Sequence, residues 1–273
     1  MELRKMTALC FSATGVTDKV VRILAEALGA EMGLFPSFRG FTKPAERMET
    51  LEFGSEDILV VGSPTYAGRM PNKIVPDYQA KLRGNGALAV AVVTFGNRAF
   101  DNSLAELCAV LEENGFCTIA AGAFPGRHAF TDALGEGRPD WNDKRAIQAF
   151  AGEIAEKIRA LRGTPLPVKV PGNPASPYYI PKGLDGEPVK FLKAKPRTDV
   201  SKCCNCGVCA RACPMGAICP DNVAEVPGTC IKCQSCVRKC THHAKYFDDT
   251  AFLSHVAMLE KNFQTPKEIE LFL

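Results

Sequence analysis

The sequence predicts an α/β protein in which a doubly wound parallel sheet is followed by a smaller, cysteine-rich α+β domain. Over residues 1–162, short apolar runs alternate with amphipathic helical stretches, which is the pattern of a parallel sheet covered by helices on both faces. Residues 163–196 are rich in Pro and Gly and lose this periodicity, so we expect a connector that lies as a strap on the surface. Residues 197–273 hold ten of the 13 Cys and are expected to form the second domain with a helical tail.

Five strands and their helices account for the first domain. The expected strands are short runs rich in apolar side chains, at residues 6–11, 32–35, 58–61, 88–94 and 117–123. Apolar residues recur at helical spacing in three stretches: Val20, Leu24 and Leu28; Phe100, Leu104, Leu107 and Leu111; and Ile147, Phe150, Ile154, Ile158 and Leu161. This pattern fits a five-stranded sheet in the order 2-1-3-4-5.

In such a sheet, ligands bind at the loops after the first, third and fourth strands. The first of these loops is Ser12-Ala13-Thr14-Gly15-Val16-Thr17, and a helix is expected to open at Asp18. Its hydroxyls and free N–H groups suit a phosphate dianion. The loop lacks the Gly-Lys-Ser/Thr of an NTPase loop and the G-x-G-x-x-G of a dinucleotide site, which leaves a monophosphate cradle. A turn that merely caps the helix is the alternative.

This loop resembles the phosphate loop of the flavodoxins, which has the form Ser/Thr-x-Thr-Gly-x-Thr and binds the phosphate of FMN. The resemblance implies that the hydroxyls and backbone of residues 12–17 hold the phosphate. Two further loops would then flank the flavin ring: Pro64, Thr65, Tyr66, Ala67, Gly68 and Arg69, and Thr94, Phe95, Gly96, Asn97 and Arg98. The flavodoxin ring often lies between a Trp and a Tyr, but Trp141 begins the last helix of the domain, so the ring is expected to be less covered.

Few residues of the first domain offer acid/base chemistry. Tyr66 could stack on the flavin, and His128, after the fifth strand, is the only plausible proton donor near its rim. The ordinary alternative for His128 is an incidental histidine on a surface loop. Arg69 and Arg98 could offset charge on the flavin or steer an acidic partner; as loop arginines they could equally be solvated.

The second domain contains one cysteine pattern twice. Cys203, Cys206, Cys209 and Cys213 recur 27 residues later as Cys230, Cys233, Cys236 and Cys240. Three thiolates in seven residues suit a 4Fe-4S cube better than zinc, which prefers two separated Cys-x2-Cys pairs. Disulfides would need an oxidising compartment, but the N-terminus has no signal-peptide core.

These runs resemble the two-cluster bacterial ferredoxins, in which the last Cys of each run serves the other cube. That resemblance assigns Cys203, Cys206, Cys209 and Cys240 to one cube, and Cys230, Cys233, Cys236 and Cys213 to the second. Thr241 stands where the second run usually has proline, so we expect a changed turn there. Cys204 and Cys219 break the spacing, and His242 and His243 could either tune a cube or face water.

The whole chain resembles the EFR-type flavodoxin-ferredoxin fusion family, which implies one FMN, two 4Fe-4S clusters and electron transfer to a redox partner. The alternative is an FMN-dependent reductase of a small acceptor, such as a quinone, nitro or oxidised sulfur compound, fed by its own clusters. A scaffold with structural clusters is a third class. A net charge of +3, with basic residues scattered, gives no nucleic-acid signature, and we expect a cytoplasmic protein without a membrane span. The sequence does not indicate an oligomeric state.

Overall fold

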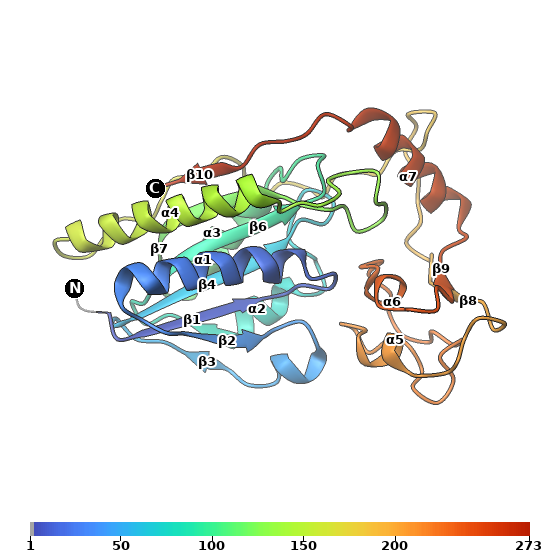
Figure 1. Cartoon of the computed structure of the whole chain (residues 1–273), viewed down its shortest axis with the longest axis horizontal. Helices are drawn as coiled ribbons and strands as arrows, with labels where there is room; N and C mark the ends of the chain where they lie inside the picture. The colour runs from blue at the N-terminus through green and yellow to red at the C-terminus, as the bar shows by residue number, and fades with distance from the viewer. Residues whose placement is uncertain (1–2) are drawn as a thin grey trace.

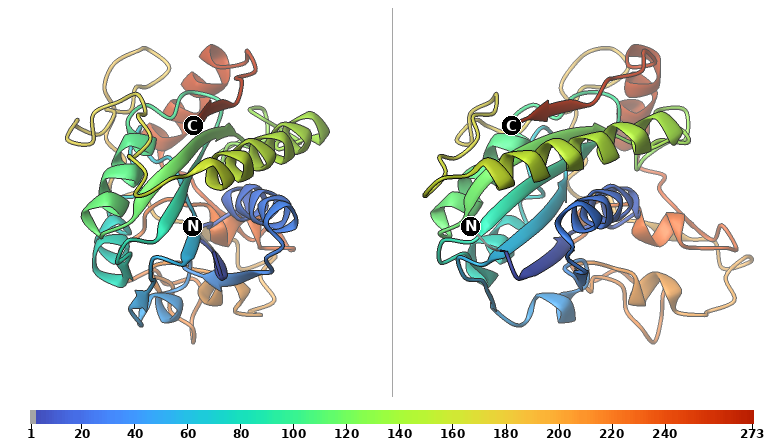
Figure 2. Two further views of the ribbon diagram at one scale, coloured as in Figure 1. Left: turned by 90° about the vertical axis from the view of Figure 1, so that its left-hand side faces the viewer. Right: turned by 60° about the vertical axis from the view of Figure 1, so that its left-hand side comes forward.

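The computed structural model describes residues 3–273. Its largest part is a sheet with helices on both faces, which is formed mainly by residues of the first domain (Figures 1 and 2). The sheet has six strands in the order β10-β7-β6-β4-β1-β2. Five of them are parallel: β1 (Lys5–Cys10), β2 (Pro36–Gly40), β4 (Asp57–Pro64), β6 (Leu88–Phe95) and β7 (Cys117–Pro125). The sixth, β10 (Glu270–Phe272), pairs antiparallel with β7. The predicted α/β class is therefore correct, but the sheet has one strand more than expected.

The predicted second strand is wrong in position. Helix α1 (Val16–Met32) runs through Met32 and ends at Gly33, whose φ of 67° lies in the left-handed region that favours glycine. Phe35 is 98% exposed, so the apolar run at 32–35 combines a helix end with a solvent-facing side chain. The true strand, β2, is an edge strand with little burial, which is why its sequence carries no apolar pattern.

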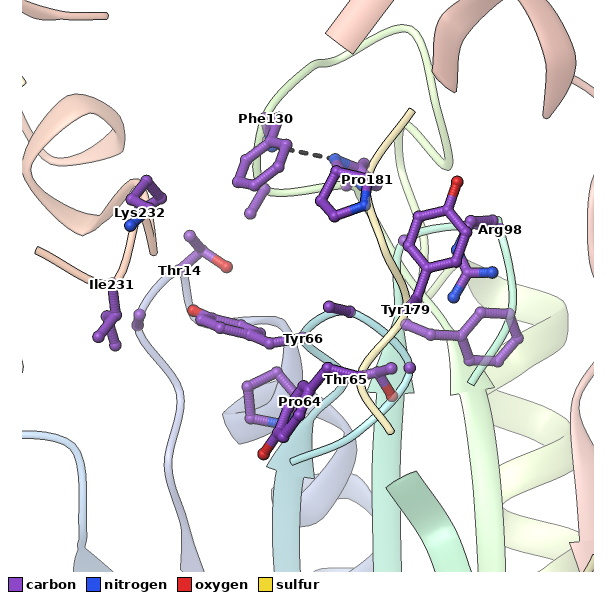
Figure 3. A pocket seen from close by; sticks show the side chains of 18 of the residues that line it. Thr14, Pro64, Thr65, Tyr66, Arg98, Phe130, Tyr179, Pro181, Ile231 and Lys232 are labelled. Atoms are coloured by element: carbon purple, nitrogen blue, oxygen red, sulfur yellow. Dashed lines mark hydrogen bonds between the residues drawn. The ribbon is translucent and has the colours of Figure 1, made fainter. Parts of the chain in front are cut away.

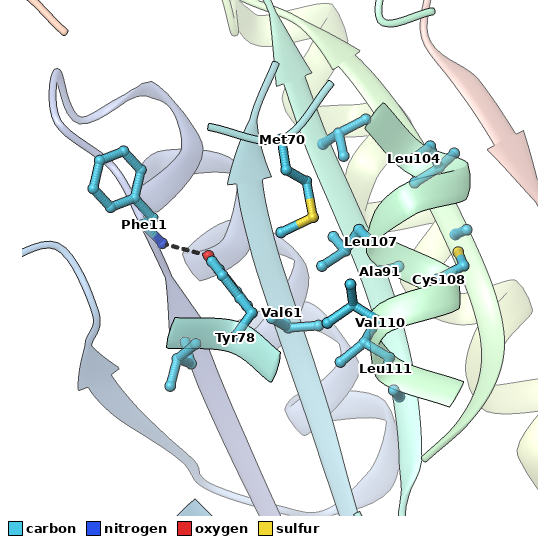
Figure 4. Packing of buried hydrophobic residues seen from close by; sticks show 14 of the residues in the cluster. Phe11, Val61, Met70, Tyr78, Ala91, Leu104, Leu107, Cys108, Val110 and Leu111 are labelled. Carbon is cyan, nitrogen blue, oxygen red and sulfur yellow. Dashed lines mark hydrogen bonds between the residues drawn. The ribbon is translucent and has the colours of Figure 1, made fainter. Parts of the chain in front are cut away.

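Two apolar cores fill the space between the sheet and its helices. One face is covered by α1 and α4 (Trp141–Ala160), and the other by α2 (Val75–Lys81) and α3 (Ser103–Glu113), as Figure 2 shows. Alternate residues of β6 face opposite ways, with Val90 in one core and Ala91 in the other. In the core against α2 and α3, the hydroxyl of Tyr78 accepts from the Phe11 N–H at 3.0 Å (Figure 4). The same hydroxyl donates to the Gly62 carbonyl at 2.7 Å.

Smaller elements complete the chain. The first domain adds η1 (Pro44–Arg47) and a short parallel pair, β3 (Leu51–Glu52) and β5 (Leu82–Arg83). The cysteine-rich part contains β8 (Arg197–Thr198), α5 (Val208–Arg211), α6 (Ser235–Arg238) and β9 (Lys245–Tyr246), and α7 (Thr250–Asn262) follows. We call residues 197–249 the cysteine module. No helix within residues 3–273 combines the length and apolar character that a membrane crossing needs.

The connector and the C-terminal segment both lie along the first domain. The Tyr179 N–H donates to the Ala67 carbonyl at 2.8 Å, and the Tyr178 hydroxyl donates to the Met70 carbonyl at 2.9 Å. After α7, the chain returns to the sheet as β10, where Glu270 pairs with Ala123. The sequence predicts a second domain that contains all of residues 197–273, but residues 270–272 belong to the sheet of the first.

The cysteine module packs beside the ends at which the parallel strands finish (Figure 1). Arg47, which is 7% exposed, donates to the Pro214 carbonyl at 2.8 Å, next to Cys213. On another side Arg238 donates to the carbonyls of Ala129 and His128 at 3.2 and 3.1 Å. These bonds fix the module against the loops where a doubly wound sheet binds ligands.

Candidate functional site

The turn after β1 presents the N-terminus of α1. Gly15 is the N-cap residue, with φ 92°, and it has no side chain with which to cap the helix. Ser12 Oγ accepts a bond from the Asp18 N–H at 3.0 Å, and Thr17 Oγ1 lies 2.7 Å from Thr94 Oγ1. Since the N–H groups of a first helical turn lack partners inside the helix, this turn could hold a phosphate.

The loop after β4 is a tight turn. Tyr66 and Arg69 exchange backbone hydrogen bonds of 2.7 and 3.1 Å, and Ala67 and Gly68 take φ values of 49° and 77° between them. The φ of Gly68 lies in the left-handed region that favours glycine, and a Cβ there would also lie 2.4 Å from Asp101 Oδ2.

The loop after β6 is covered by His128. A Cβ at Gly96 would lie 2.2 Å from His128 Cδ2, so the imidazole packs directly on this glycine. The Phe130 N–H donates to His128 Nδ1 at 3.1 Å, which places the proton of the neutral ring on Nε2. Burial, with nearby positive charge, lowers the pKa of His128 to about 4. At neutral pH the ring is therefore uncharged, and its Nε2–H can donate a hydrogen bond.

All three loops border a single cavity of about 600 Å³, within the range of small-molecule sites (Figure 3). The residues named from sequence that line it are Ala13, Thr14, Val16, Thr17, Pro64, Thr65, Tyr66, Ala67, Gly68, Thr94, Phe95, Gly96, Arg98 and His128. Residues far apart in the chain therefore meet at the carboxyl edge of the sheet.

Four of the residues named from sequence support the loops and do not line this cavity: Ser12, Gly15, Arg69 and Asn97. The Arg69 guanidinium is paired with the buried Glu106, with Nε 2.9 Å from Oε2. Asn97 Nδ2 donates to the carbonyls of Phe263 and Thr265 at 2.6 and 3.0 Å. Arg69 therefore fixes its own loop, and Asn97 anchors the segment after α7.

Much of the remaining cavity wall comes from the connector and α7. These residues are Tyr178, Tyr179, Pro181, Phe191, Leu192, His255 and Leu259, with Phe130 from the loop after β7. The Arg98 guanidinium carbon lies 4.2 Å from the centre of the Tyr179 ring, which joins the connector to the third loop. The sequence does not single out His255, because its position in an amphipathic helix carries no local signal.

The same cavity is also lined by the second cysteine run, through Thr229, Cys230, Ile231 and Lys232. Figure 3 shows Ile231 and Lys232 across from Tyr66. Tyr66 also packs against the apolar core that includes Cys233. Burial raises the pKa of the Tyr66 phenol, and negative charge at Cys233 and Cys230 raises it further. Tyr66 thus borders both the cavity and the second cysteine run.

The two cysteine runs fold alike. Asn205 and Lys232, 27 residues apart, have φ values of 53° and 56°, and Gly207 and Gln234 have 70° and 63°. In the first run Asn205 and Gly207 lead into the four-residue helix α5, and in the second run Lys232 and Gln234 lead into the four-residue helix α6. The sequence duplication is therefore also a duplication of backbone structure.

The turns that follow the two runs are also alike. The Ala217 N–H lies 3.3 Å from Cys213 Sγ, and the Ala244 N–H lies 3.3 Å from Cys240 Sγ. The changed turn expected at Thr241 is wrong, because this backbone geometry needs no proline.

Cysteines from the two runs come together in a crossed pattern. A small second cavity is lined by Cys213 of the first run together with Cys230, Cys233 and Cys236 of the second. Cys209 and Cys236 share one apolar cluster, in which Cys203 and Cys213 are partly buried. Burial raises the pKa of Cys236 to about 12, with further contributions from negative charge at Cys230 and Cys213. Cys240 is likewise near enough to Cys209 to raise its pKa, after the larger effect of burial.

No three His, Cys, Asp or Glu side chains within residues 3–273 converge as ligands of one metal ion. A 4Fe-4S cube differs from such a site because it offers a separate iron to each of four thiolates. The four thiols around the small cavity have the donor chemistry that a cube requires.

The two runs differ in exposure. In the first, Cys206 is exposed, and its pKa is lowered chiefly by a hydrogen bond from the Val208 N–H. At the equivalent position of the second run, Cys233 is 8% exposed, whereas the third cysteines of the two runs, Cys209 and Cys236, are buried alike. The second run lies inward beside the large cavity, and the first reaches the surface.

The remaining cysteines and histidines do not line the small cavity. Cys204 is exposed, and neither it nor Cys219 lines the small cavity. Cys10 and Cys108 are buried among apolar side chains, and burial raises the pKa of both thiols. His242 is exposed.

None of the known protein-family models matches this chain, and no curated protein matches it. Three solved structures show weak similarity. A flavodoxin from the domain Archaea is 15% identical, with 57% of this chain and 99% of that chain covered, at a TM-score of 0.38. A flavodoxin of Streptococcus pneumonia TIGR4 is 20% identical, with 56% and 99% covered, at 0.39. An NADH:FMN oxidoreductase (EMOB) in its apo form is 13% identical, with 59% and 91% covered, at 0.41. At such low TM-scores, the α/β fold of this chain is established by its own sheet topology.

Proposed function

We propose that this protein is an electron-transfer protein of the EFR-type flavodoxin-ferredoxin fusion kind, which relays electrons between two 4Fe-4S clusters and FMN and on to a redox partner. FMN exchanges electrons singly or in pairs, whereas each cube passes one at a time. The combination converts single electrons into pairs.

The single observation that carries this proposal is the shared wall of the large cavity. Its floor is the three loops at the carboxyl edge of the sheet, and another part of its wall is the second cysteine run. A flavin in that cavity and a cube held by Cys230, Cys233, Cys236 and Cys213 would be immediate neighbours, with Tyr66 beside both.

Residues of the first domain would hold FMN as follows. The first turn of α1, with Thr14 and Thr17, receives the phosphate, and the N–H groups there supply its hydrogen bonds. Tyr66 offers an aromatic face to the ring, and the loop that contains Gly96 would border the ring.

The exposure of the two runs suggests an order for the relay. The cube of Cys203, Cys206, Cys209 and Cys240 would lie near the surface, where a partner protein can reach it. The second cube would lie inward, between the first cube and the flavin. A partner therefore exchanges electrons at the outer cube, and the inner cube exchanges them with FMN.

Anaerobic purification followed by flavin, iron and sulfide analysis and EPR tests the cofactor content. One FMN and two cubes per chain are expected. Zinc in place of iron and sulfide, or material without flavin, contradicts the proposal.

Lys245 is expected to tune both cubes. It is 3% exposed, its ammonium donates to the Val223 carbonyl, and its charge lowers the pKa values of both Cys209 and Cys236. A reduced cube is more negative than an oxidised one, so a nearby cation favours reduction. We expect Lys245→Met to lower the cluster potentials by roughly 50 mV, since a partly buried unit charge contributes on the order of 1 kcal/mol.

Redox titration followed by EPR measures this shift. Lys239→Met is the matched control, because Lys239 is exposed and its charge is screened by water. Equal potentials in the wild type and Lys245→Met, with both cubes intact, would show that the buried ammonium does not tune them.

A second function is favoured by one observation. The cavity extends beyond the three loops to an aromatic wall built from the connector and α7. That wall suits an FMN-dependent reductase of a small acceptor, which would bind next to the flavin. Turnover of such acceptors far above that of free FMN would distinguish the reductase from a pure carrier.

A further inference from the structure

Two imidazoles face the cavity with opposite hydrogen-bonding preferences. His255 Nδ1 lies 2.8 Å from the Lys182 carbonyl oxygen, and because a carbonyl only accepts, Nδ1 carries the proton. Burial lowers the pKa of His255, so its ring is neutral and its Nε2 is an acceptor. His128 has the other tautomer, because its Nδ1 accepts from Phe130 and its Nε2–H is a donor.

Both Nε2 atoms remain available to a ligand. Both residues line the cavity, and no hydrogen bond engages either Nε2 within residues 3–273. In the same part of the chain, only Thr118 has a fully buried side-chain oxygen or nitrogen without a partner. Because neither Nε2 atom has a partner and neither is fully buried, both are accessible, and the residues that carry them line the cavity.

The walls around these histidines are aromatic. The Phe130 ring centre is 5.1 Å from that of His128 and 6.4 Å from that of His255, so Phe130 connects the two. Phe191 lies 5.4 Å from His255 at an interplanar angle of 30°. The two guanidinium groups near His128, those of Arg98 and Arg238, are already paired with Asp101 and Asp132. Because the walls are aromatic and the nearby positive charge is already paired, this part of the cavity favours a flat, uncharged ring as its ligand over an anion.

We propose that this end of the cavity binds a flat, uncharged aromatic compound that carries both a carbonyl and a hydroxyl or N–H group. The carbonyl accepts from His128 Nε2–H, and the hydroxyl or N–H donates to His255 Nε2. This inference rests on the proposed function in one respect, namely that FMN occupies the part of the cavity bordered by the three loops. It deepens that function by naming the chemical class of the acceptor.

The test compares three small ligands by calorimetry and by the shift they cause in the flavin absorption of FMN-loaded protein. 4-Hydroxyacetophenone, at a pH where its phenol is neutral, carries both groups, acetophenone lacks the hydroxyl, and phenol lacks the carbonyl. In the wild type we expect 4-hydroxyacetophenone to bind roughly tenfold tighter than either of the others, because each lost hydrogen bond leaves a buried partner unpaired.

Two variants assign each group to its histidine. In His255→Phe the preference over acetophenone should disappear while the preference over phenol remains, and in His128→Phe the reverse is expected. His242→Phe, the same change at an exposed position outside the cavity, should bind all three ligands as the wild type does.

Three results would overturn the inference. The first is equal affinity for the three ligands in the wild type, which needs no variant to be folded. The second is a preference that survives the loss of its histidine. The third is a fall of tenfold or more in FMN affinity in both variants, which would mean that the histidines contact the flavin. Absence of FMN binding in the wild type would instead contradict the proposed function, and calorimetry on the flavin-free protein would still report the ligand preferences.

Discussion

Cys213→Ala is expected to abolish the inner cube and to weaken the outer one, although Cys213 belongs to the first run in the sequence. The physical reason is the crossed arrangement, in which Cys213 lines the small cavity with three cysteines of the second run. Cys213 also follows α5, whose Cys209 belongs to the outer group. Because a cluster site contributes folding energy, its loss should loosen the chain between the runs. We expect about half of the iron, or less, to remain.

Iron and sulfide analysis, EPR and thermal unfolding measure the effect. Cys204→Ala and Cys219→Ala are matched controls, since both remove a cysteine of the same module that does not line the small cavity, and both should keep all the iron. Cys233→Ala should abolish the same EPR signal as Cys213→Ala. If Cys213→Ala instead matches Cys206→Ala, the runs are not crossed.

Thr14→Asp is expected to abolish FMN binding under ordinary conditions while leaving riboflavin binding nearly unchanged. Thr14 lines the cavity in the turn before α1, where the phosphate is proposed to lie. A carboxylate there would face the phosphate dianion, and a like-charge contact costs several kcal/mol. The affinity for FMN should fall on the order of 100-fold or more, at 1.4 kcal/mol for each tenfold.

Titration of the apoprotein with FMN and with riboflavin separates charge repulsion from misfolding. Thr14→Asn has nearly the shape of Thr14→Asp without the charge, so it should retain FMN affinity to within about tenfold. Equal losses for FMN and riboflavin in Thr14→Asp would show that the turn supports the ring and not the phosphate.

The sequence predicted those parts of the fold that carry a local pattern. Strands β4, β6 and β7 are apolar because both faces of the sheet are covered, so their runs stand out. The edge strand β2 and the three-residue strand β10 have no such pattern, and both were missed. β10 exists because the chain returns to β7 after more than a hundred residues, a pairing that no local window contains.

The candidate site divides in the same way. The three loops were identifiable because a doubly wound sheet places them together at one edge. His255 and Lys245 were not, since each depends on contacts with distant segments, His255 with the connector at Lys182 and Lys245 with the Val223 carbonyl. The position of the second cysteine run against the cavity could not be predicted either, because the packing of one domain on another produces no periodic pattern in the sequence of either domain.

The most direct test of the central claim is electron transfer inside one molecule. The holoprotein is mixed anaerobically with a limiting one-electron reductant, and the absorption of the cubes and of FMN is followed in time at several protein concentrations. Transfer within the chain predicts that the cubes are reduced first and that flavin reduction follows with a rate constant independent of protein concentration. A rate that rises in proportion to protein concentration, or a flavin that stays oxidised beside reduced cubes, would contradict it.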